Sequence, residues 1–263
     1  MLKIEHLRKT FNQGTINEKK VFTDLNLTVE DGDFVTIIGS NGAGKSTMLN
    51  AISGTIIPEG GKITLNGLDI TYMSDVKRAK YIGRVFQDPM MGTAPNMWIA
   101  ENMALANRRG KSHTLKWGMA KGEEKEYFKS LLSRLNLGLE DVIESKVGLL
   151  SGGQRQAITL LMATLKRPEL LLLDEHTAAL DPKTAETVLE LTDQIVKENN
   201  LTTLMVTHNM QNAIKYGNRL IMMHNGSVIF DIKGEEKSKL TVEALLNKFK
   251  DSKDVLSDRA ILG

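Results

Sequence analysis

The chain has 263 residues, of which 41% are hydrophobic, enough for one substantial core with a smaller lobe attached. Its 34 basic and 32 acidic side chains leave a net charge of +2, so the overall charge does not attract nucleic acid or anionic lipid. The absence of cysteine excludes disulfides and cysteine metal sites and fits a reducing cytosol.

The first part of the chain alternates in polarity, as strands with one buried face do. The strands of this predicted antiparallel β layer are expected at residues 2–7, 21–29 and 62–65. Asn66-Gly67 follows the third strand and is a good turn signal. Residues 1–7 have no signal-peptide core, and no segment approaches the ~18–20 apolar residues that span a bilayer.

A phosphate-binding loop is predicted after the apolar run Phe34–Ile38, which is typical of a buried strand. The loop is Gly39-Ser40-Asn41-Gly42-Ala43-Gly44-Lys45-Ser46-Thr47, and a helix is expected from Ser46 onward. Its backbone N–H groups and the helix N-terminus would surround the phosphates of a nucleotide. Lys45 should reach the β- and γ-phosphates, and the Ser46 hydroxyl should ligate Mg²⁺. A glycine-rich turn before a helix is the plainer alternative, which the flanking strand disfavours.

Gln87 follows the strand-like segment 82–86 and opens a turn, so it is a candidate ligand for Mg²⁺ or water, or else an ordinary surface residue. Flexible and aromatic side chains come just after it: Met90, Met91, Met97, Trp98 and Met103. They suit either a docking groove for a partner's helix or the core of a helical lobe, and the sequence favours neither.

Helical spacing at residues 97–105 and 123–135 predicts that lobe. A basic, glycine-containing loop lies between the two helices, and its lysines are Lys111, Lys116 and Lys121. We interpret these lysines as part of a solvated loop rather than as a partner-binding or lipid-facing surface.

The segment Leu150-Ser151-Gly152-Gly153-Gln154, followed by apolar residues 157–163, is typical of a glycine loop that caps a helix. Ser151 is the candidate N-cap, and the loop presents N–H donors at the positive end of the helix. This is a second phosphate-binding surface, although an ordinary helix start would explain the serine alone. The loop has no evident use within its own chain, which indicates that two copies meet to complete one site.

Four leucines at residues 170–173 predict a strand covered on both faces, with a buried helix as the alternative. At the end of this strand Asp174 would hold Mg²⁺, and Glu175 would polarise the attacking water. A further strand at residues 201–207 leads to His208, which is a candidate ligand of the γ-phosphate or else a surface residue.

These elements predict an α/β fold, in which a P-loop NTPase core with a mostly parallel sheet carries an antiparallel β layer and an inserted helical lobe. The β layer and the P-loop part of the core are expected in residues 1–87. The helical lobe is expected in residues 88–165 and ends in the glycine loop at residues 150–154, which is called the signature loop below. Residues 166–263 would form the second part of the core, with a helix over 241–249 before a charged tail.

The chain resembles the nucleotide-binding subunits of ATP-binding-cassette (ABC) systems. The matching motifs run in family order over nearly the whole chain: residues 39–47, Gln87, residues 150–154, residues 170–175, Ala179-Leu180-Asp181 and His208. The resemblance implies that the Ser151-Gly152-Gly153-Gln154 loop of one copy closes on ATP held by the other. It further implies that Asp181 couples the two sites and that Phe11 stacks on adenine, unless Phe11 only packs beside the first strand.

Three features depart from the family pattern. His176 stands where many members carry proline, and Ala178 stands where serine is frequent, so a hydrogen bond at the dimer contact is expected to be missing. The polar stretch 12–20 that follows Phe11 is unusually long, which affects the expected stacking geometry.

The resemblance implies an ATPase that drives a membrane ABC transporter by ATP-dependent dimer closure at the cytoplasmic face of the membrane. Its expected partners are an integral-membrane permease, a second copy of itself and a separate substrate-binding protein, but no nucleic acid. Residues 91–95 and 174–185 resemble a branch of bacterial importers linked to tryptophan or tyrosine. One alternative is a soluble non-transport ABC ATPase, which commonly has two cassettes or a coiled-coil insertion. Another is a P-loop kinase or GTPase, which has no use for the signature loop.

Overall fold

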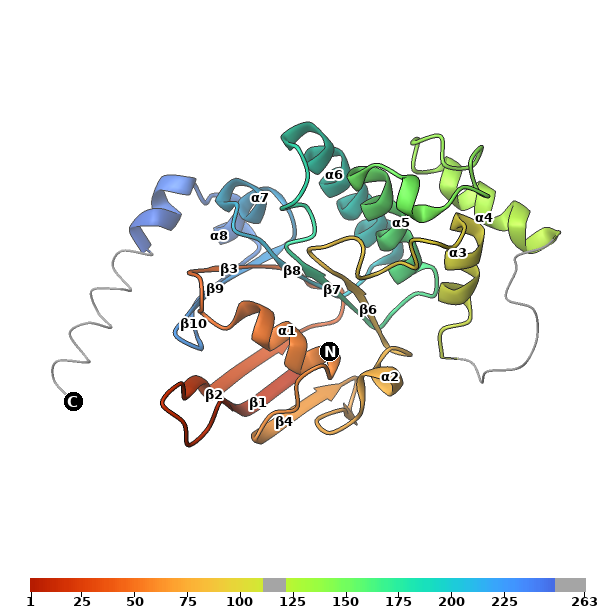
Figure 1. Ribbon diagram of the computed structural model, residues 1–263. Coiled ribbons are helices and arrows are strands. Elements are labelled where there is room, and N and C mark those ends of the chain that lie inside the picture. Colours follow the sequence, from red (N-terminus) through yellow and green to blue (C-terminus); the bar gives the residue numbers. More distant parts are fainter. Residues whose placement is uncertain (111–121, 249–263) are drawn as a thin grey trace, which may run out of the picture. The chain divides into compact units, whose positions relative to one another are not determined.

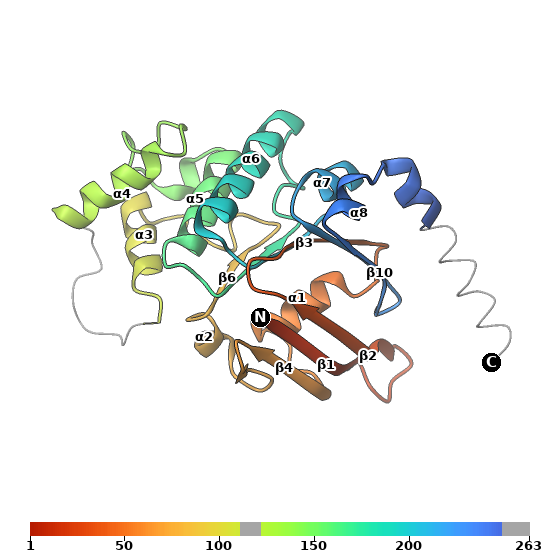
Figure 2. The same cartoon turned by 180° about the vertical axis from the view of Figure 1, so that it is seen from behind.

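A computed structural model describes residues 1–110 and 122–248, and these residues form two compact units (Figures 1 and 2). Among the described residues, the first unit contains Met1–Ile52, Ile56–Thr71 and Leu204–Lys248, and the second contains Ser53–Thr55 and Tyr72–Thr203 without residues 111–121. Helices and both parallel and antiparallel strands occur, which confirms the predicted α/β class. The three-segment division of the sequence at residues 87 and 165 stays a prediction.

An antiparallel sheet in the first unit has the strand order β2-β1-β4-β5. The strands are β1 (Leu2–Phe11), β2 (Lys19–Val29), β4 (Gly60–Leu65) and β5 (Leu68–Asp69). All three predicted strands are present, but β1 runs four residues past its predicted end at Leu7. A register shift between Ile4 and Leu7, with His6 at a φ of 51°, lets the strand continue through a bulge. Much of the polar stretch after Phe11 forms the turn between β1 and β2.

A second group of strands in the first unit carries the phosphate loop. Its strands are β3 (Phe34–Gly39), β9 (Arg219–His224), β10 (Ser227–Lys233) and β8 (Thr203–Val206), which begins at the boundary between the units. β3 pairs in parallel with β9, and β10 is antiparallel to β9. The helices are α1 (Lys45–Ser53), α7 (Met210–Lys215) and α8 (Glu235–Ser238), and residues 242–248 are also helical, as expected for this segment. Both views place α1 over the antiparallel sheet (Figures 1 and 2).

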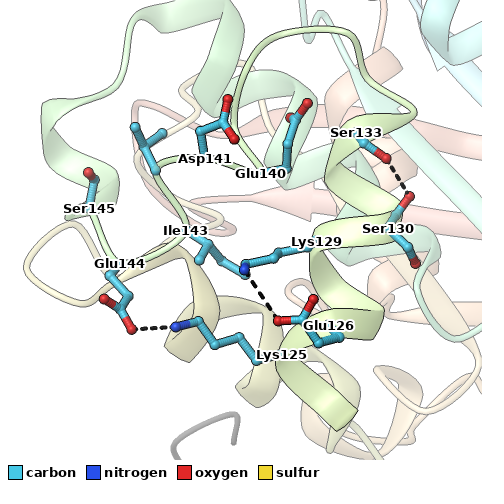
Figure 3. A pocket seen from close by; sticks show the side chains of 11 residues that line it. Lys125, Glu126, Lys129, Ser130, Ser133, Glu140, Asp141, Ile143, Glu144 and Ser145 are labelled. Atoms are coloured by element: carbon cyan, nitrogen blue, oxygen red, sulfur yellow. Dashed lines mark hydrogen bonds and ion pairs between the residues drawn. The ribbon is translucent and has the colours of Figure 1, made fainter. Parts of the chain in front are cut away.

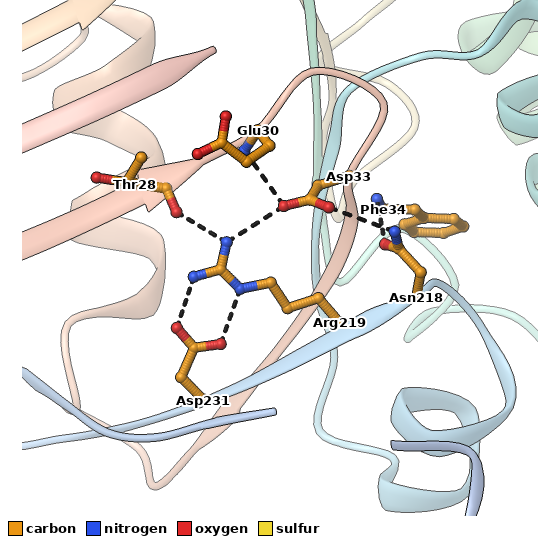
Figure 4. Close-up of polar contacts among 7 residues, drawn as sticks. All are labelled: Thr28, Glu30, Asp33, Phe34, Asn218, Arg219 and Asp231. Carbon is orange, nitrogen blue, oxygen red and sulfur yellow. Dashed lines mark hydrogen bonds and ion pairs between the residues drawn. The ribbon is translucent and has the colours of Figure 1, made fainter. Parts of the chain in front are cut away.

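A buried guanidinium ties the start of β3 to β9 and β10 (Figure 4). Arg219 donates to both carboxylate oxygens of Asp231, at 2.7 and 2.5 Å, and to Asp33 Oδ2 at 3.2 Å. A fourth bond, of 2.8 Å, goes to the carbonyl of Thr28 at the end of β2. These bonds raise the pKa of Arg219, with the pair to Asp231 as the largest cause, and they anchor the strand that feeds the phosphate loop.

The second unit contains a pair of parallel strands and the helical lobe. The strands are β6 (Ile82–Val85) and β7 (Leu170–Asp174), so the leucine run is a strand rather than a helix. The helices are α2 (Asp75–Arg78), α3 (Ile99–Asn107), α4 (Glu123–Ser133), the 3₁₀ helix η1 (Val147–Leu149), α5 (Gly152–Thr164) and α6 (Pro182–Asn199). Figure 1 shows α3, α4, α5 and α6 gathered together, and apolar residues of α3, α4 and α5 share one core.

The helices predicted at residues 97–105 and 123–135 occur as α3 and α4, with ends shifted by two residues. α3 begins two residues later than expected, because the backbone N–H of Trp98 donates to Glu101 Oε2 at 2.8 Å and so marks the start of the helix. The predicted lysine loop, with Lys111, Lys116 and Lys121, lies outside the described residues, and so does Phe249 at the end of the last predicted helix.

Candidate functional site

The phosphate loop connects β3 to α1 and curls around its own lysine. Lys45 is 7% exposed, and its Nζ donates to the carbonyls of Gly39 at 2.8 Å and Ser40 at 3.1 Å. Gly42 and Gly44 have φ of 80° and 98°, which side chains rarely adopt. A Cβ on Gly44 would also lie 2.6 Å from the ring of Phe22 in β2. The loop therefore requires glycine both for its turn and for its packing.

His208 lies beside the start of this loop in the first unit. It is exposed, follows β8 as predicted, and lines a cavity of about 200 Å³ together with Ile38, Gly39, Ser40, Met210 and Met222. Ser40 Oγ also lies 3.5 Å from Nδ1 of His224, at the end of β9. Two imidazoles thus border the entry to the loop, and sequence reasoning identified only one of them.

Phe11 is half-buried at the end of β1, opposite Lys19 of β2. Lys9 Nζ lies 5.4 Å from the centre of its ring. Lys19 Nζ is 3.5 Å from the place that a Cβ on Gly42 would occupy. The hairpin therefore places the Lys19 ammonium next to the phosphate loop. The end of β1 that carries Phe11 lies opposite Lys19 and so is close to the loop as well.

In the second unit, Gln87 and the acidic pair lie at the C-terminal ends of two neighbouring parallel strands. Val85 of β6 is in register with Leu173 of β7, so Gln87 and Asp174 leave the strand pair at the same edge. Gln87 is exposed, whereas the side chain of Asp174 is only 14% exposed. The sequence predicted that both residues stand at the ends of strands in one sheet, and β6 and β7 are paired in that way.

Arg84, which sequence reasoning missed, contacts Asp174. Its Nη2 lies 3.4 Å from Asp174 Oδ2, its Nη1 donates to Ser53 Oγ at 2.9 Å, and its guanidinium lies 4.6 Å from the centre of the Phe86 ring. Burial lowers the pKa of Arg84, and the charge of Asp174 opposes that effect. An arginine inside the otherwise apolar run 82–86 was the available signal, because a charge in a buried strand needs a partner.

Glu175 has a left-handed backbone, with a φ of 47°, directly after β7. Such a conformation is uncommon for a residue with a side chain and occurs where the chain turns sharply. The turn is closed by bonds from Ala178 N to the Glu175 carbonyl at 2.9 Å and from Leu180 N to the Thr177 carbonyl at 3.2 Å. Asp181 ends the turn as the N-cap of α6, and its Oδ1 accepts from Thr184 N at 3.1 Å. The Thr184 hydrogen bonds lower the pKa of the Asp181 carboxyl.

The signature loop opens α5 in the way that the sequence predicted. Ser151 Oγ accepts from Gln154 N at 3.2 Å, and Gln154 Oε1 accepts from Ser151 N at 3.1 Å, which is a reciprocal capping box. Ser151 and Gly152 are exposed, while Gly153 is buried against α6. A Cβ on Gly153 would lie 2.1 Å from Thr184 Cγ2, so this glycine lets α5 and α6 approach closely.

The methionines and the tryptophan after Gln87 differ in burial. Met90, Met91 and Trp98 are 38%, 68% and 37% exposed, whereas Met103 is fully buried in the core of the lobe. Met103 therefore belongs to the core of the lobe, and a docking role for the three exposed side chains stays a prediction.

A larger hollow, of about 720 Å³, lies between α4 and residues 140–145 (Figure 3). An ion pair of 2.5 Å between Lys125 and Glu144 links its two sides. None of the predicted site residues lines it, so size alone would have misplaced the candidate site in this lobe.

Among the described residues, no group of three or more His, Cys, Asp or Glu side chains is arranged to hold a metal ion. Sites for Mg²⁺ beside phosphates need fewer protein ligands, because the phosphates and water supply the remaining oxygens. The Ser46 hydroxyl and the Asp174 carboxylate are hard oxygen donors of the type that Mg²⁺ prefers. Within residues 1–110 and 122–248, no helix has the length and apolar character needed to span a membrane.

Comparison with known proteins gives a consistent result. A family model described as "ABC transporter" matches residues 22–178. A tyrosine transport ATP-binding protein of Clostridioides difficile is 50% identical over 249 residues, which cover 95% of this chain and 98% of that protein. A phosphonates import ATP-binding protein of Ruegeria is 36% identical, and the match covers 89% of each chain.

Solved structures agree in fold. A dimeric ATP-binding cassette in a post-hydrolysis state, bound to ADP and Pi, is 29% identical with a TM-score of 0.73, covering 89% of this chain and 98% of that one. A component of an ABC transporter complex from Clostridium perfringens is 25% identical with a TM-score of 0.75, covering 94% and 93%.

Proposed function

Because this chain belongs to the ABC transporter family and is an ATP-hydrolysing subunit of a transporter, we propose that it powers the import of an aromatic amino acid, with tyrosine as the cargo to test first. The observation that carries this proposal is the 50% identity to a tyrosine transport ATP-binding protein over 98% of its length. Cargo contacts belong to other subunits, so the cargo is assigned by analogy with that relative.

The phosphates of ATP are proposed to bind along residues 39–47, at the N-terminus of α1. The bonds from Lys45 to the Gly39 and Ser40 carbonyls support this, because they hold the ammonium inside the loop. Phosphate oxygens would replace those carbonyls as stronger, charge-assisted acceptors. Phe11 is proposed to stack on adenine, since its strand reaches the loop through Lys19.

Glu175 is proposed to orient and polarise the attacking water, with His208 and Gln87 as further ligands around the γ-phosphate. The backbone strain at Glu175 supports a functional role, since such strain gathers at active sites. Mg²⁺ is proposed to bind Ser46, Asp174 and Gln87, and when bound it would neutralise charge on the phosphates. Arg84 is proposed to hold the Asp174 carboxylate in place.

Two copies are proposed to enclose two ATP molecules, with the Ser151-Gly152-Gly153-Gln154 loop of each copy meeting the nucleotide of the other. The exposure of Ser151 and Gly152 at a helix N-terminus supports this role, and so does the dimeric form of the related cassette bound to ADP and Pi. Asp181 is proposed to couple the two sites. The γ-phosphate would contact both copies in this arrangement, so its loss on hydrolysis would let the dimer reopen.

A permease is proposed to dock on the second unit, at the cytoplasmic face of the membrane. The exposed Met90, Met91 and Trp98 offer adaptable apolar contacts. A hollow of about 310 Å³ in the same unit, lined in part by Val76 and Phe86, offers a recess for a partner's side chain. A separate substrate-binding protein is proposed to deliver the cargo from the other side.

The hydrolytic roles are tested by two substitutions. Glu175→Gln should bind ATP, form a stable dimer on a sizing column and lose turnover, because the amide cannot polarise water. Lys45→Ala should instead lose nucleotide binding, measured by titration with a fluorescent ATP analogue. Glu190→Gln, an exposed carboxylate on α6, is the control and should hydrolyse ATP normally. Wild-type turnover by Glu175→Gln would refute the assigned base, and tight ATP binding by Lys45→Ala would refute the phosphate role.

The transport role is tested by affinity capture of the tagged chain from gently solubilised host membranes. We expect a multi-span membrane protein at near-equal amount, and tyrosine uptake by vesicles that contain the complex and internal ATP. Met91→Asp should reduce recovery of that partner while leaving nucleotide binding intact. Recovery of soluble partners alone would instead favour the non-transport ATPase.

A further inference from the structure

The imidazole of His176 is sealed in the interior directly after Glu175. The residue is 2% exposed, and its Nε2 lies 3.1 Å from Oγ1 of Thr192, a fully buried residue of α6. Burial lowers the pKa of His176 to about 4, so the ring is neutral near pH 7. Thr192 lies about three turns into the helix that Asp181 caps. The turn that carries Glu175 is therefore fastened to α6 at two well-separated points.

The direction of this hydrogen bond follows from the bond that Thr192 makes within its own helix. Thr192 Oγ1 donates its single proton to the carbonyl of Val188 at 2.7 Å. The oxygen can then only accept from His176, so the imidazole carries its proton on Nε2 and donates it. The contact thus has a defined donor and acceptor, and a threonine-to-valine change would remove it with little change in shape.

The backbone at Glu175 needs such a restraint. Its φ of 47° is a conformation that persists only where the surroundings determine it. The turn-closing bonds are donated by Ala178 and Leu180, which are more exposed than His176, and one of them is accepted by the Glu175 carbonyl. His176, by contrast, is adjacent to Glu175 and held from inside. Its hydrogen bond to Thr192 therefore restrains the backbone next to Glu175.

We propose that His176 is a positioning residue for ATP hydrolysis, whose hydrogen bond to Thr192 holds the Glu175 turn against α6 and sets the direction of the Glu175 carboxylate. This inference rests on the proposed role of Glu175. A side-chain hydrogen bond thus supplies the restraint on this turn.

The test uses Thr192→Val, which removes the acceptor, and Thr192→Ser, which keeps it. Thr192→Val should lower kcat about tenfold while KM for ATP stays within about twofold, because the base is displaced but the phosphate loop is not. Thr192→Ser should restore kcat. Thr187→Val is the matched control, because Thr187 is exposed on the same helix and bonds its own i−4 carbonyl at 3.2 Å. It should leave kcat unchanged.

A readout independent of activity is the imidazole ¹⁵N spectrum. His176 should show a protonated, slowly exchanging Nε2 in the wild type and in Thr192→Ser, and faster exchange in Thr192→Val. Glu175→Gln distinguishes a failure of the proposed base from a failure of the proposed positioning by His176. If Glu175→Gln keeps turnover, the proposed base is wrong. The positioning role is refuted if Glu175→Gln is inactive but Thr192→Val has wild-type kcat. It is also refuted if Thr192→Val lowers kcat and Tm and raises KM together, because that is the result of general structural damage.

Discussion

Replacing Arg219 by methionine should destabilise the first unit strongly, because it leaves two carboxylates without their common partner (Figure 4). The side chain of Asp33 is 10% exposed, and breaking a buried pair costs about 3–5 kcal/mol. Asp33 keeps its bonds from Glu30 N at 3.2 Å and Asn218 Nδ2 at 3.3 Å. Asp231 is 37% exposed and can be hydrated. We therefore expect a loss at the lower end, about 3 kcal/mol.

Urea unfolding near pH 7.5, with ATP absent, measures this loss through the midpoint at a constant m-value. Arg219→Lys should lose less, because it keeps the charge but cannot form the two parallel bonds to Asp231. Adding Asp33→Asn to Arg219→Met should recover part of the loss, because the buried negative charge of Asp33 that lacks a partner is then removed.

The control is Arg134→Met, whose partner Glu198 lies 2.5 Å away on the surface, with the two side chains 60% and 41% exposed. Exposed pairs contribute about 0–1 kcal/mol, so this variant should unfold almost as the wild type does. If Arg219→Met loses no more stability than Arg134→Met, the argument that burial makes this pair costly to break is wrong.

Three further predictions follow from close contacts and burial. Gly153→Ala should lower ATPase activity, because the added methyl displaces Thr184, and adding Thr184→Ala should restore the activity. If the double variant does not recover, the contact with Thr184 is not the cause of the loss. Burial lowers the pKa of Lys237 from 10.5 to about 8, so its charged form penalises folding below pH 8, and the penalty fades as pH rises toward 10.5. The unfolding free energy of the wild type relative to Lys237→Met should therefore rise by about 2 kcal/mol between pH 7.5 and 9.5, and equal slopes would contradict this. Phe11→Ala should weaken ATP binding more than Phe11→Trp does, and equal affinity in equilibrium titrations would leave Phe11 with a packing role only.

Much of the candidate site could be predicted because its parts are short and local. The phosphate loop, the capping box of Ser151 and Gln154, and the strand of four leucines each depend on residues within about ten positions of one another. Glycine conformations, helix caps and the burial of an apolar strand follow from chemistry within such a segment. The order of these segments then indicated an α/β nucleotide-binding fold, and the structure has that fold.

The contacts that hold these parts in place join residues far apart in the sequence. Arg84 contacts Asp174 because two parallel strands are in register, and His176 meets Thr192 because α6 folds back over its turn. The bulge at His6 likewise depends on packing between elements, and so does the burial of Met103 while Met91 is exposed. The sequence by itself therefore determined which chemical groups are present and which local backbone carries them. Only the tertiary structure decided which buried charges and imidazoles become partners, because that choice depends on strand register and helix packing rather than on any local pattern.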